Sequence, residues 1–214
     1  MAGGLLLGVA AATLLGAALP AHNPGSSFED PPPDKIVIKV ATVNGSGCPA
    51  GTAAVAVSAD NTAFTVTYSD YLAQAGGNSE PTAARKNCQL SLLVHVPQGF
   101  TYAIASADYR GFAALSPAPG APSGPRTTSR VAQHRVPHAP FGGPYDDNWQ
   151  ATDETDWAQL VYAPCGVQRN FNINTELRVT AGSDPSKVSF MTMDSTDGDI
   201  STVYHLAWKE CPEK

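Results

Sequence analysis

Five histidines could bind a metal, and their surroundings decide how well they would do so. If a leader were cleaved after Ala21, His22 would offer an amine and an imidazole, which are nitrogen ligands that copper favours. His95 or His205 would supply a second ring, as in copper-dependent polysaccharide oxygenases. A Pro-rich arm follows His22 where a strand would be needed to fix it, so an exposed residue in an extended arm is the alternative interpretation.

A second histidine pair and two acidic stretches could also hold a metal. His134 and His138 would share one helix face, but Pro137 prevents a helix and no glutamate stands where a zinc protease needs one. The acids fit no calcium-loop pattern, and the sequence does not set the carboxylate separation that glycoside hydrolysis requires. We therefore predict solvated turns, no metal site and no cofactor. The acids are Asp146, Asp147, Asp153, Glu154 and Asp156, then Asp194, Asp197 and Asp199.

Aromatic side chains flank the first acidic stretch. Exposed rings can stack on sugars or on partner proteins, whereas buried rings fill a core. Tyr145, Trp149 and Trp157 are therefore candidate binding residues, with core packing as the alternative. Signals for covalent catalysis are missing, because the chain has no G-x-S-x-G elbow and no phosphate-binding glycine loop.

Four cysteines can pair in three ways. Pairing within each half of the chain joins Cys48 to Cys88 and Cys165 to Cys211. Each loop would span roughly 40–46 residues and contribute about 3–4 kcal/mol in the chain-entropy model. Zinc binding is the alternative, but the spacings are long, no C-x-x-C occurs, and export favours oxidation.

The elements that must position these residues begin after an apolar leader. The leader carries no charge and ends in small residues, which predicts a signal peptide over residues 1–21, cleaved after Ala18 or Ala21. Because no Lys or Arg stands at its start, an uncleaved signal anchor is the alternative. A Pro-rich arm over residues 22–34 follows, and residues 35–214 have the length of one domain.

Alternating apolar and polar residues predict most strands of this domain. The clearest strand is 171–179, where Asn172, Asn174 and Glu176 alternate with apolar residues. Strands over 52–58 and 63–69 are close enough to form an antiparallel hairpin. Further strands are predicted over residues 36–40, 89–96, 100–106, 188–193 and 202–209.

The middle of the chain differs from this pattern. Residues 116–144 are rich in Pro and Gly, which predicts a long surface excursion. No helical periodicity of useful length follows the leader. The fold class is therefore all-β, an antiparallel β-sandwich of jelly-roll-like form with two disulfides and one long Pro-rich loop.

Charge and short motifs limit the partners. The net charge is -6 and no basic run occurs, so binding to nucleic acid or to anionic lipid is not expected. After the leader, no segment is apolar and long enough to span a bilayer. Asn44-Gly45-Ser46 matches the N-glycosylation motif, with an unmodified turn as the alternative.

Several stretches, taken in order, resemble the secreted domain of unknown function 4360 family of fungi and bacteria. The resemblance implies a small secreted β-rich domain with four cysteines and carries over no catalytic residue. It does not extend to residues 116–125 or 134–138. The matching stretches are 47–52, 64–71, 85–90, 97–100, 108–112, 164–166, 172–174, 194–195 and 208–211.

These observations favour a secreted extracellular protein that acts without catalysis, as a binding module at a cell surface or wall. Its partner would be a cell-wall polysaccharide or a surface protein. A secreted carbohydrate-active enzyme, either a copper oxygenase or a glycosidase, is the alternative, and a structural wall protein is a second one. The oligomeric state is left open by the sequence.

Overall fold

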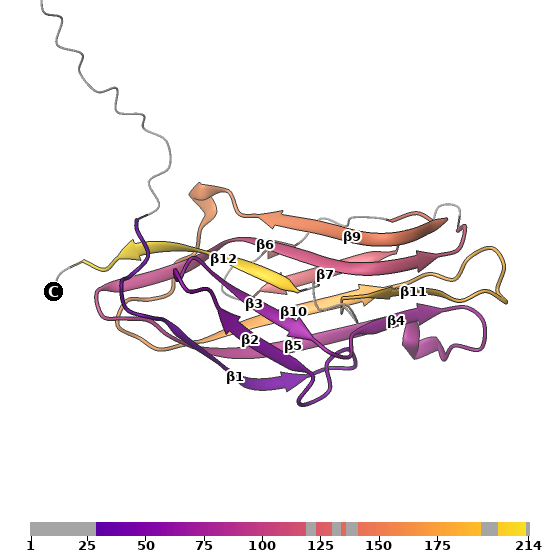
Figure 1. Cartoon of the computed structure of the whole chain (residues 1–214), viewed down its shortest axis with the longest axis horizontal. Helices are drawn as coiled ribbons and strands as arrows, with labels where there is room; N and C mark the ends of the chain where they lie inside the picture. Colours follow the sequence, from indigo (N-terminus) through magenta and orange to yellow (C-terminus); the bar gives the residue numbers. More distant parts are fainter. Residues whose placement is uncertain (1–28, 119–122, 130–133, 136–140, 194–200, 213–214) are drawn as a thin grey trace, which may run out of the picture.

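The computed structural model describes residues 29–118, 123–129, 134–135, 141–193 and 201–212. Two antiparallel sheets contain all of its strands, which run close to the long axis of the molecule in Figure 1. Five strands form one sheet in the order β1-β5-β10-β7-β8. The second sheet has the order β2-β3-β12-β6-β11-β4, with β9 paired to β6.

The chain crosses from one sheet to the other several times: β1, β5, β7, β8 and β10 lie in the five-stranded sheet, and the other strands lie in the second sheet. Single-turn 3-10 helices follow β4 (Pro81–Ala84) and β9 (Trp157–Gln159). The strands are β1 (Val37–Asn44), β2 (Ala53–Val57), β3 (Ala63–Tyr68), β4 (Leu72–Ala75), β5 (Arg85–His95), β6 (Phe100–Leu115), β7 (Gly124–Ser129), β8 (His134–Arg135), β9 (Tyr145–Glu154), β10 (Asn170–Arg178), β11 (Ser189–Thr192) and β12 (Thr202–Glu210).

The core lies between the two sheets. The Phe64 ring of β3 meets the Phe171 ring of β10 edge to face, with centroids 6.3 Å apart. The Tyr71 hydroxyl is 3.1 Å from the Thr175 hydroxyl, which joins the sheets through a buried hydrogen bond. Each fully buried Leu, Ile or Phe stabilises the fold by about 1.5–3 kcal/mol. The predicted antiparallel β-sandwich is confirmed.

The predicted pattern of strands is largely confirmed. The hairpin of β2 and β3 forms with Val55 opposite Val66, and β10 has the buried and solvated faces that its alternation predicts. Besides β7 and β8, which lie in the predicted excursion, three elements were not predicted: β4, β9 and the second half of β6. Both β9 and the second half of β6 carry polar residues on one face, and β4 is short.

The segment predicted as an excursion over 116–144 does not stay outside the sheets. Within it, β7 pairs with β10 over six positions, from Gly124 opposite Arg178 to Ser129 opposite Ile173. Among the described residues, β8 pairs with β7 at Thr128 and Arg135, and an isolated bridge joins Ser123, just before β7, to Phe141. The strand forms although Pro125, opposite Leu177, has no amide hydrogen to donate.

The end of the predicted N-terminal arm is held against the sandwich by Asn61. Its side-chain amide donates hydrogen bonds to the carbonyl oxygens of Pro32 and Asp34, both at 2.9 Å. Its side-chain oxygen accepts one from the Ile36 amide at 3.2 Å. Asn61 is buried and has φ 58°, a left-handed conformation that Asn adopts more readily than most residues. The predicted signal peptide, 1–21, and His22 lie outside the described residues.

Both disulfides have the predicted pairing. Cys48 is bonded to Cys88 and Cys165 to Cys211, with Cα atoms 5.3 Å and 5.9 Å apart. Both distances fall within the usual range for disulfides. In the part of the chain that the structure describes, no helix has the length and apolarity needed to cross a membrane.

Candidate binding groove

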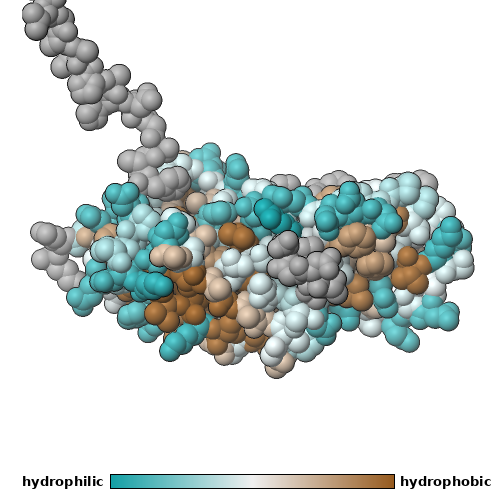
Figure 2. All heavy atoms as spheres, viewed as in Figure 1, coloured by the Kyte–Doolittle hydropathy of each residue, from teal (hydrophilic) through white to brown (hydrophobic). Residues whose placement is uncertain are grey.

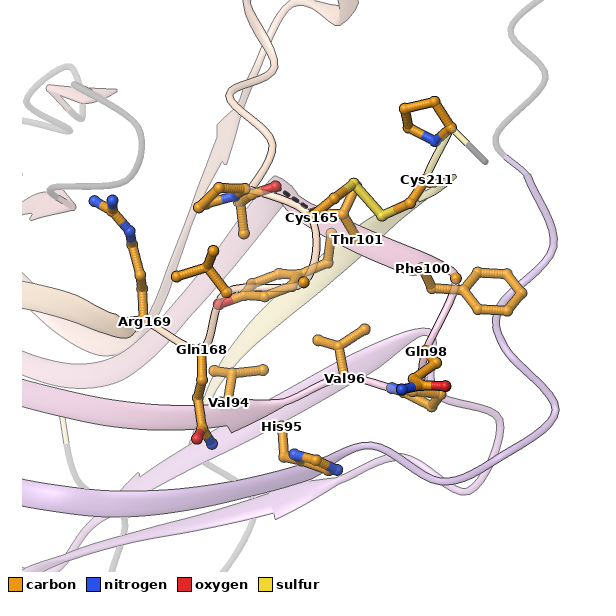
Figure 3. Close-up of a pocket in the computed structure, with 18 residues that line it drawn as sticks. Val94, His95, Val96, Gln98, Phe100, Thr101, Cys165, Gln168, Arg169 and Cys211 are labelled. Carbon is orange, nitrogen blue, oxygen red and sulfur yellow. Dashed lines mark hydrogen bonds between the residues drawn. A yellow bond between two sulfur atoms is a disulfide. The ribbon is translucent and has the colours of Figure 1, made fainter. Parts of the chain in front are cut away.

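A groove of about 620 Å³ opens at the end of the sandwich where β5 turns into β6. Its walls come from three separate parts of the sequence: residues 94–102, the segment 163–169, and residues 211–212 at the C-terminal end. Figure 3 shows Gln168, His95 and Gln98 arranged around the smaller side chains of Val94 and Val96.

The first wall is the turn between β5 and β6. Gly99 has φ 86°, a left-handed conformation that costs a glycine little and suits the reversal of the chain. The Phe100 amide donates to the Pro97 carbonyl at 3.4 Å, and the Cys211 amide donates to the Gly99 carbonyl at 2.7 Å. These bonds fix the turn against the C-terminal end of β12.

The second wall is the segment after the Trp157–Gln159 turn. The Ala163 amide donates to the Tyr102 carbonyl at 2.9 Å, and the Thr101 hydroxyl donates to the Ala163 carbonyl at 2.5 Å. Both bonds tie the segment to β6. The disulfide from Cys165 to Cys211 then joins this wall to the C-terminal end. The groove is therefore closed covalently on one side.

The groove combines an apolar floor with polar side chains at its rim. Val94 and Tyr102 are buried, whereas His95, Gln98, Gln168 and Arg169 are exposed. Burial raises the pKa of Tyr102 to about 12, so its hydroxyl stays protonated at physiological pH. Carboxamides and a neutral imidazole can donate hydrogen bonds to a polar ligand and accept them from it, and a guanidinium can donate them.

The same lining offers little for catalysis. No Asp or Glu is among the described residues that line the groove, so a pair of carboxylates for acid–base chemistry is missing there. The Thr101 hydroxyl is bonded to a carbonyl, and both cysteines are oxidised. The arrangement can bind and orient a ligand, but its lining supplies no activated nucleophile.

Comparison with known proteins identifies the family of the chain. The model of the family described as a domain of unknown function, DUF4360, matches residues 34–211. The chain belongs to the DUF4360 family. A relative from Arthroderma benhamiae, described as an uncharacterized secreted protein, is 34% identical over 194 residues, which are 90% of this chain and 78% of the relative. The resemblance seen in the sequence motifs is confirmed.

The structure separates the three aromatic candidates of this DUF4360 protein. Trp149 lies in the core instead of on the surface, because β9 directs it inward, where its indole donates to the Thr192 carbonyl at 3.1 Å. Tyr145 is half-buried and packs against Phe141, with ring centroids 5.4 Å apart. Trp157 is 49% exposed and lies on the segment that leads into the groove. Of the three, Trp157 has the accessibility that a binding residue needs.

His95 and His205, each considered as a partner of His22 in a copper site, lie apart, and His22 itself is outside the described residues. His95 lines the groove at the end of the five-stranded sheet, whereas His205 lies on β12 in the other sheet. His205 is 2.9 Å from Asp108, and Asp108 also accepts a hydrogen bond from Thr152 at 2.6 Å. His134 is described only as backbone in β8, and His138 lies outside the described residues.

The Asp108 cluster has the right residue types for a catalytic triad but the wrong order. A triad needs the histidine between nucleophile and acid, whereas here the carboxylate lies between the hydroxyl and the imidazole. Partial burial alone would raise the pKa of Asp108, but hydrogen bonds from Thr152 and His205 lower it overall. The cluster therefore holds an ionised carboxylate and does not activate Thr152.

The acidic stretches and the glycosylation motif have different surroundings from those expected. Asp146, Asp147, Asp153 and Glu154 lie on β9 rather than in a turn, and the second acidic stretch, 194–199, lies outside the described residues. Among the described residues, no three His, Cys, Asp or Glu side chains are grouped to hold a metal. Asn44 ends β1 and is exposed, so its glycosylation stays a prediction.

Sequence reasoning missed most of the groove residues. Gln98, Gln168 and Arg169 carry no motif, and they come together only through the fold. One signal was available: the Pro97-Gln98-Gly99 turn and Cys165 flank positions where loops at the rim of a sandwich expose polar side chains.

Proposed function

We propose that this DUF4360 protein is a secreted, non-enzymatic binding module that holds a segment of cell-wall polysaccharide in the groove. The observation that carries the proposal is the composition of the groove: an apolar floor, a rim of amide, imidazole and guanidinium groups, and no carboxylate in its lining. Sugar rings present C–H groups to apolar floors and hydroxyls to amides, so the two kinds of surface complement each other.

An extracellular site of action is part of this proposal. The apolar leader and the two disulfides are typical of proteins exported to an oxidising environment. Mass spectrometry of the culture medium tests the export. The secreted form should lack residues 1–18 or 1–21, whereas a secreted chain that retains Met1 would contradict cleavage.

Retention on insoluble wall polymers tests the binding. The purified secreted protein is mixed with chitin, β-glucan or cellulose, and the bound fraction is measured against polymer concentration. Q168A/R169A should weaken binding roughly tenfold, which is the usual effect of removing a few central contacts. K39A/Q89A removes one cation and one amide from the outer face of the five-stranded sheet and serves as the control.

The same samples distinguish the alternatives. Release of soluble sugars, if abolished by His22→Ala after copper addition, would favour the copper enzyme and overturn the binding proposal. Retention that Q168A/R169A leaves unchanged would overturn the assignment of the groove. Neither retention nor turnover on any polymer would favour a structural wall protein.

A further inference from the structure

The outer face of the seven-stranded sheet carries two phenylalanine rings outside the core. Phe112 of β6 and Phe190 of β11 lie with ring centroids 6.0 Å apart and ring planes inclined by 35°. Both are partly exposed, and neither belongs to the described core or to the side chains packed against it. The two rings pack on each other, and the parts of them that stay exposed form an apolar surface that a ligand can reach.

The register of the strands places small or polar side chains beside the two rings. Phe190 lies between Gln74 of β4 and Ala114 of β6 in one row across the sheet, and the small Ala114 leaves space beside it. Leu72, 38% exposed, continues the apolar surface on β4, opposite Thr192. We call Leu72, Phe112 and Phe190 the phenylalanine platform.

Polar side chains border this platform on the β9 side. Asn148 is paired with Phe112, Gln150 with Arg110, and Asp146 with Ala114. All of these β9 residues are exposed. In Figure 2, hydrophobic residues in the right-hand half of the molecule lie beside the hydrophilic residues of β9. The polar side chains of β9 therefore lie next to the rings, on the strand adjacent to β6.

The charges at this border limit the class of ligand. Arg110 and Asp146 carry opposite charges near the same rings, so the border has no marked sign and gives an anionic chain no advantage. Among the described side chains, the amides of Gln74 and Gln150 form no hydrogen bond, which leaves their donors and acceptors available to a ligand. Uncharged hydroxyls are the groups that such amides bind best.

We propose that the phenylalanine platform binds a chain of neutral hexose residues, a glucan or chitin segment lying across the strands. Aromatic faces take the apolar faces of the sugars, and amides at the border take their hydroxyls. Neighbouring strands are about 4.8 Å apart, a spacing close to the length of one hexose unit, so successive sugars meet successive strands. The platform is a second surface, separate from the groove, and its proposal does not depend on the groove.

Binding of cellohexaose and chitohexaose, measured by isothermal titration calorimetry on the secreted full chain, tests this proposal. F112A/F190A should weaken binding roughly tenfold or more, because two aromatic contacts are lost together. F112Y/F190Y keeps both rings and should bind within about threefold of the wild type. Both rings are partly buried, so F112A/F190A should lose some stability, whereas F112Y/F190Y should unfold in urea like the wild type. Binding is compared at a temperature where urea unfolding shows each variant to be folded.

The groove variant Q168A/R169A separates this proposal from the previous one. If it loses wall-polymer retention while hexasaccharide binding still depends on Phe112 and Phe190, both surfaces are supported. Hexasaccharide binding that F112A/F190A leaves unchanged would overturn the platform, as would an equal loss in F112Y/F190Y or an absence of binding by the wild type. The two variant results leave the groove proposal untouched, whereas an absence of binding by the wild type would count against both surfaces.

Discussion

The two disulfides lie near opposite ends of β5 and in opposite surroundings. Cys48 and Cys88 are 0% and 1% exposed and lie at the closed end of the sandwich. Gly47 lies against the ring of Tyr71 at this end. Cys165 is exposed and lines the groove at the other end, beside Arg169. The disulfide between Cys48 and Cys88 is thus part of the core, whereas the one between Cys165 and Cys211 shapes an open surface.

Removing each disulfide separately should give the largest change in the free energy of unfolding, and it tests this comparison. The bonded residues are separated by 40 and 46 positions, so chain entropy alone predicts about 4 kcal/mol for each. C48A/C88A also leaves a cavity in the core, and we expect a total loss of about 5 kcal/mol or more. C165A/C211A should lose about 2–4 kcal/mol, because the exposed C-terminal end can relax.

Urea unfolding of the two double variants measures both losses. The binding assay should rank the variants in the reverse order at a temperature where each is folded, because only Cys165 and Cys211 shape the groove. Equal losses of stability, or weaker wall binding by C48A/C88A than by C165A/C211A, would contradict the division between a core end and a binding end.

Two glycines sharpen the same comparison. A Cβ atom at Gly47 would overlap the buried Tyr71 ring, so Gly47→Ala should destabilise the protein by about 2–3 kcal/mol. At Gly166, on the groove wall, no atom lies within 4 Å of a Cβ position. Gly166 has φ 70°, so Gly166→Ala should cost about 1 kcal/mol from the backbone alone. Thermal unfolding measures the loss of stability in both variants. A smaller loss for Gly47→Ala than for Gly166→Ala would show that the Tyr71 ring can move aside at little cost.

The closed end could be predicted from the sequence better than the groove. Alternation identified β5 and β10, whose inward residues surround Cys88, and pairing within each half gave the correct disulfides. These signals are local, because a strand with one buried face shows its period in any short stretch of sequence. The structure extends the predicted strand 89–96 back to Arg85, and this places Cys88 on the buried face of β5.

Other parts depend on contacts that the sequence does not reveal. Strand β9 was interpreted as acidic turns, because an edge strand with one solvated face can carry Asp146 and Asp147 while it still buries Trp149. Pro125 argued against a strand that nevertheless forms between β10 and β8. The groove forms only when three distant segments of the chain come together, and the role of Asn61 depends on its bonds to the N-terminal arm. A short stretch of sequence shows neither.

The hydrogen bond between the sheets is a finer test of the closed end. Tyr71→Phe removes the partner of the buried Thr175 hydroxyl and should cost about 1–2 kcal/mol. Thr175→Val in the same chain removes the unsatisfied hydroxyl, so the double variant should recover part of this loss. Tyr102→Phe, at the groove end, is the matched control and should change the free energy of unfolding by less than about 0.5 kcal/mol. Equal effects of the two tyrosine variants in urea unfolding would contradict a special role for Tyr71.

The smallest expected effect is on the pH dependence of stability, which should differ between the closed end of the sandwich and the groove end. Glu176, beside Thr175 on β10, pairs with Arg85 at 2.6 Å and with Arg178. Burial alone would raise the pKa of Glu176, but the hydrogen bonds and positive charges of the two arginines lower it overall. A carboxyl whose pKa is lowered by folding stabilises the protein above its unfolded pKa of about 4.3, and that contribution is lost as the pH falls through the folded value.

Glu176→Gln should therefore cost about 1 kcal/mol at pH 7, since Arg85 is largely exposed and its attraction is screened by solvent. The difference from the wild type should stay constant above about pH 5 and shrink toward zero in stronger acid. At the groove end, no carboxylate is among the described residues that line the cavity with Arg169, so R169A should show no such acid dependence. Urea unfolding between pH 2 and pH 7 measures both curves. A Glu176→Gln difference that persists at the acid end would show that the arginines act through packing rather than charge, because a protonated Glu176 no longer forms an ion pair.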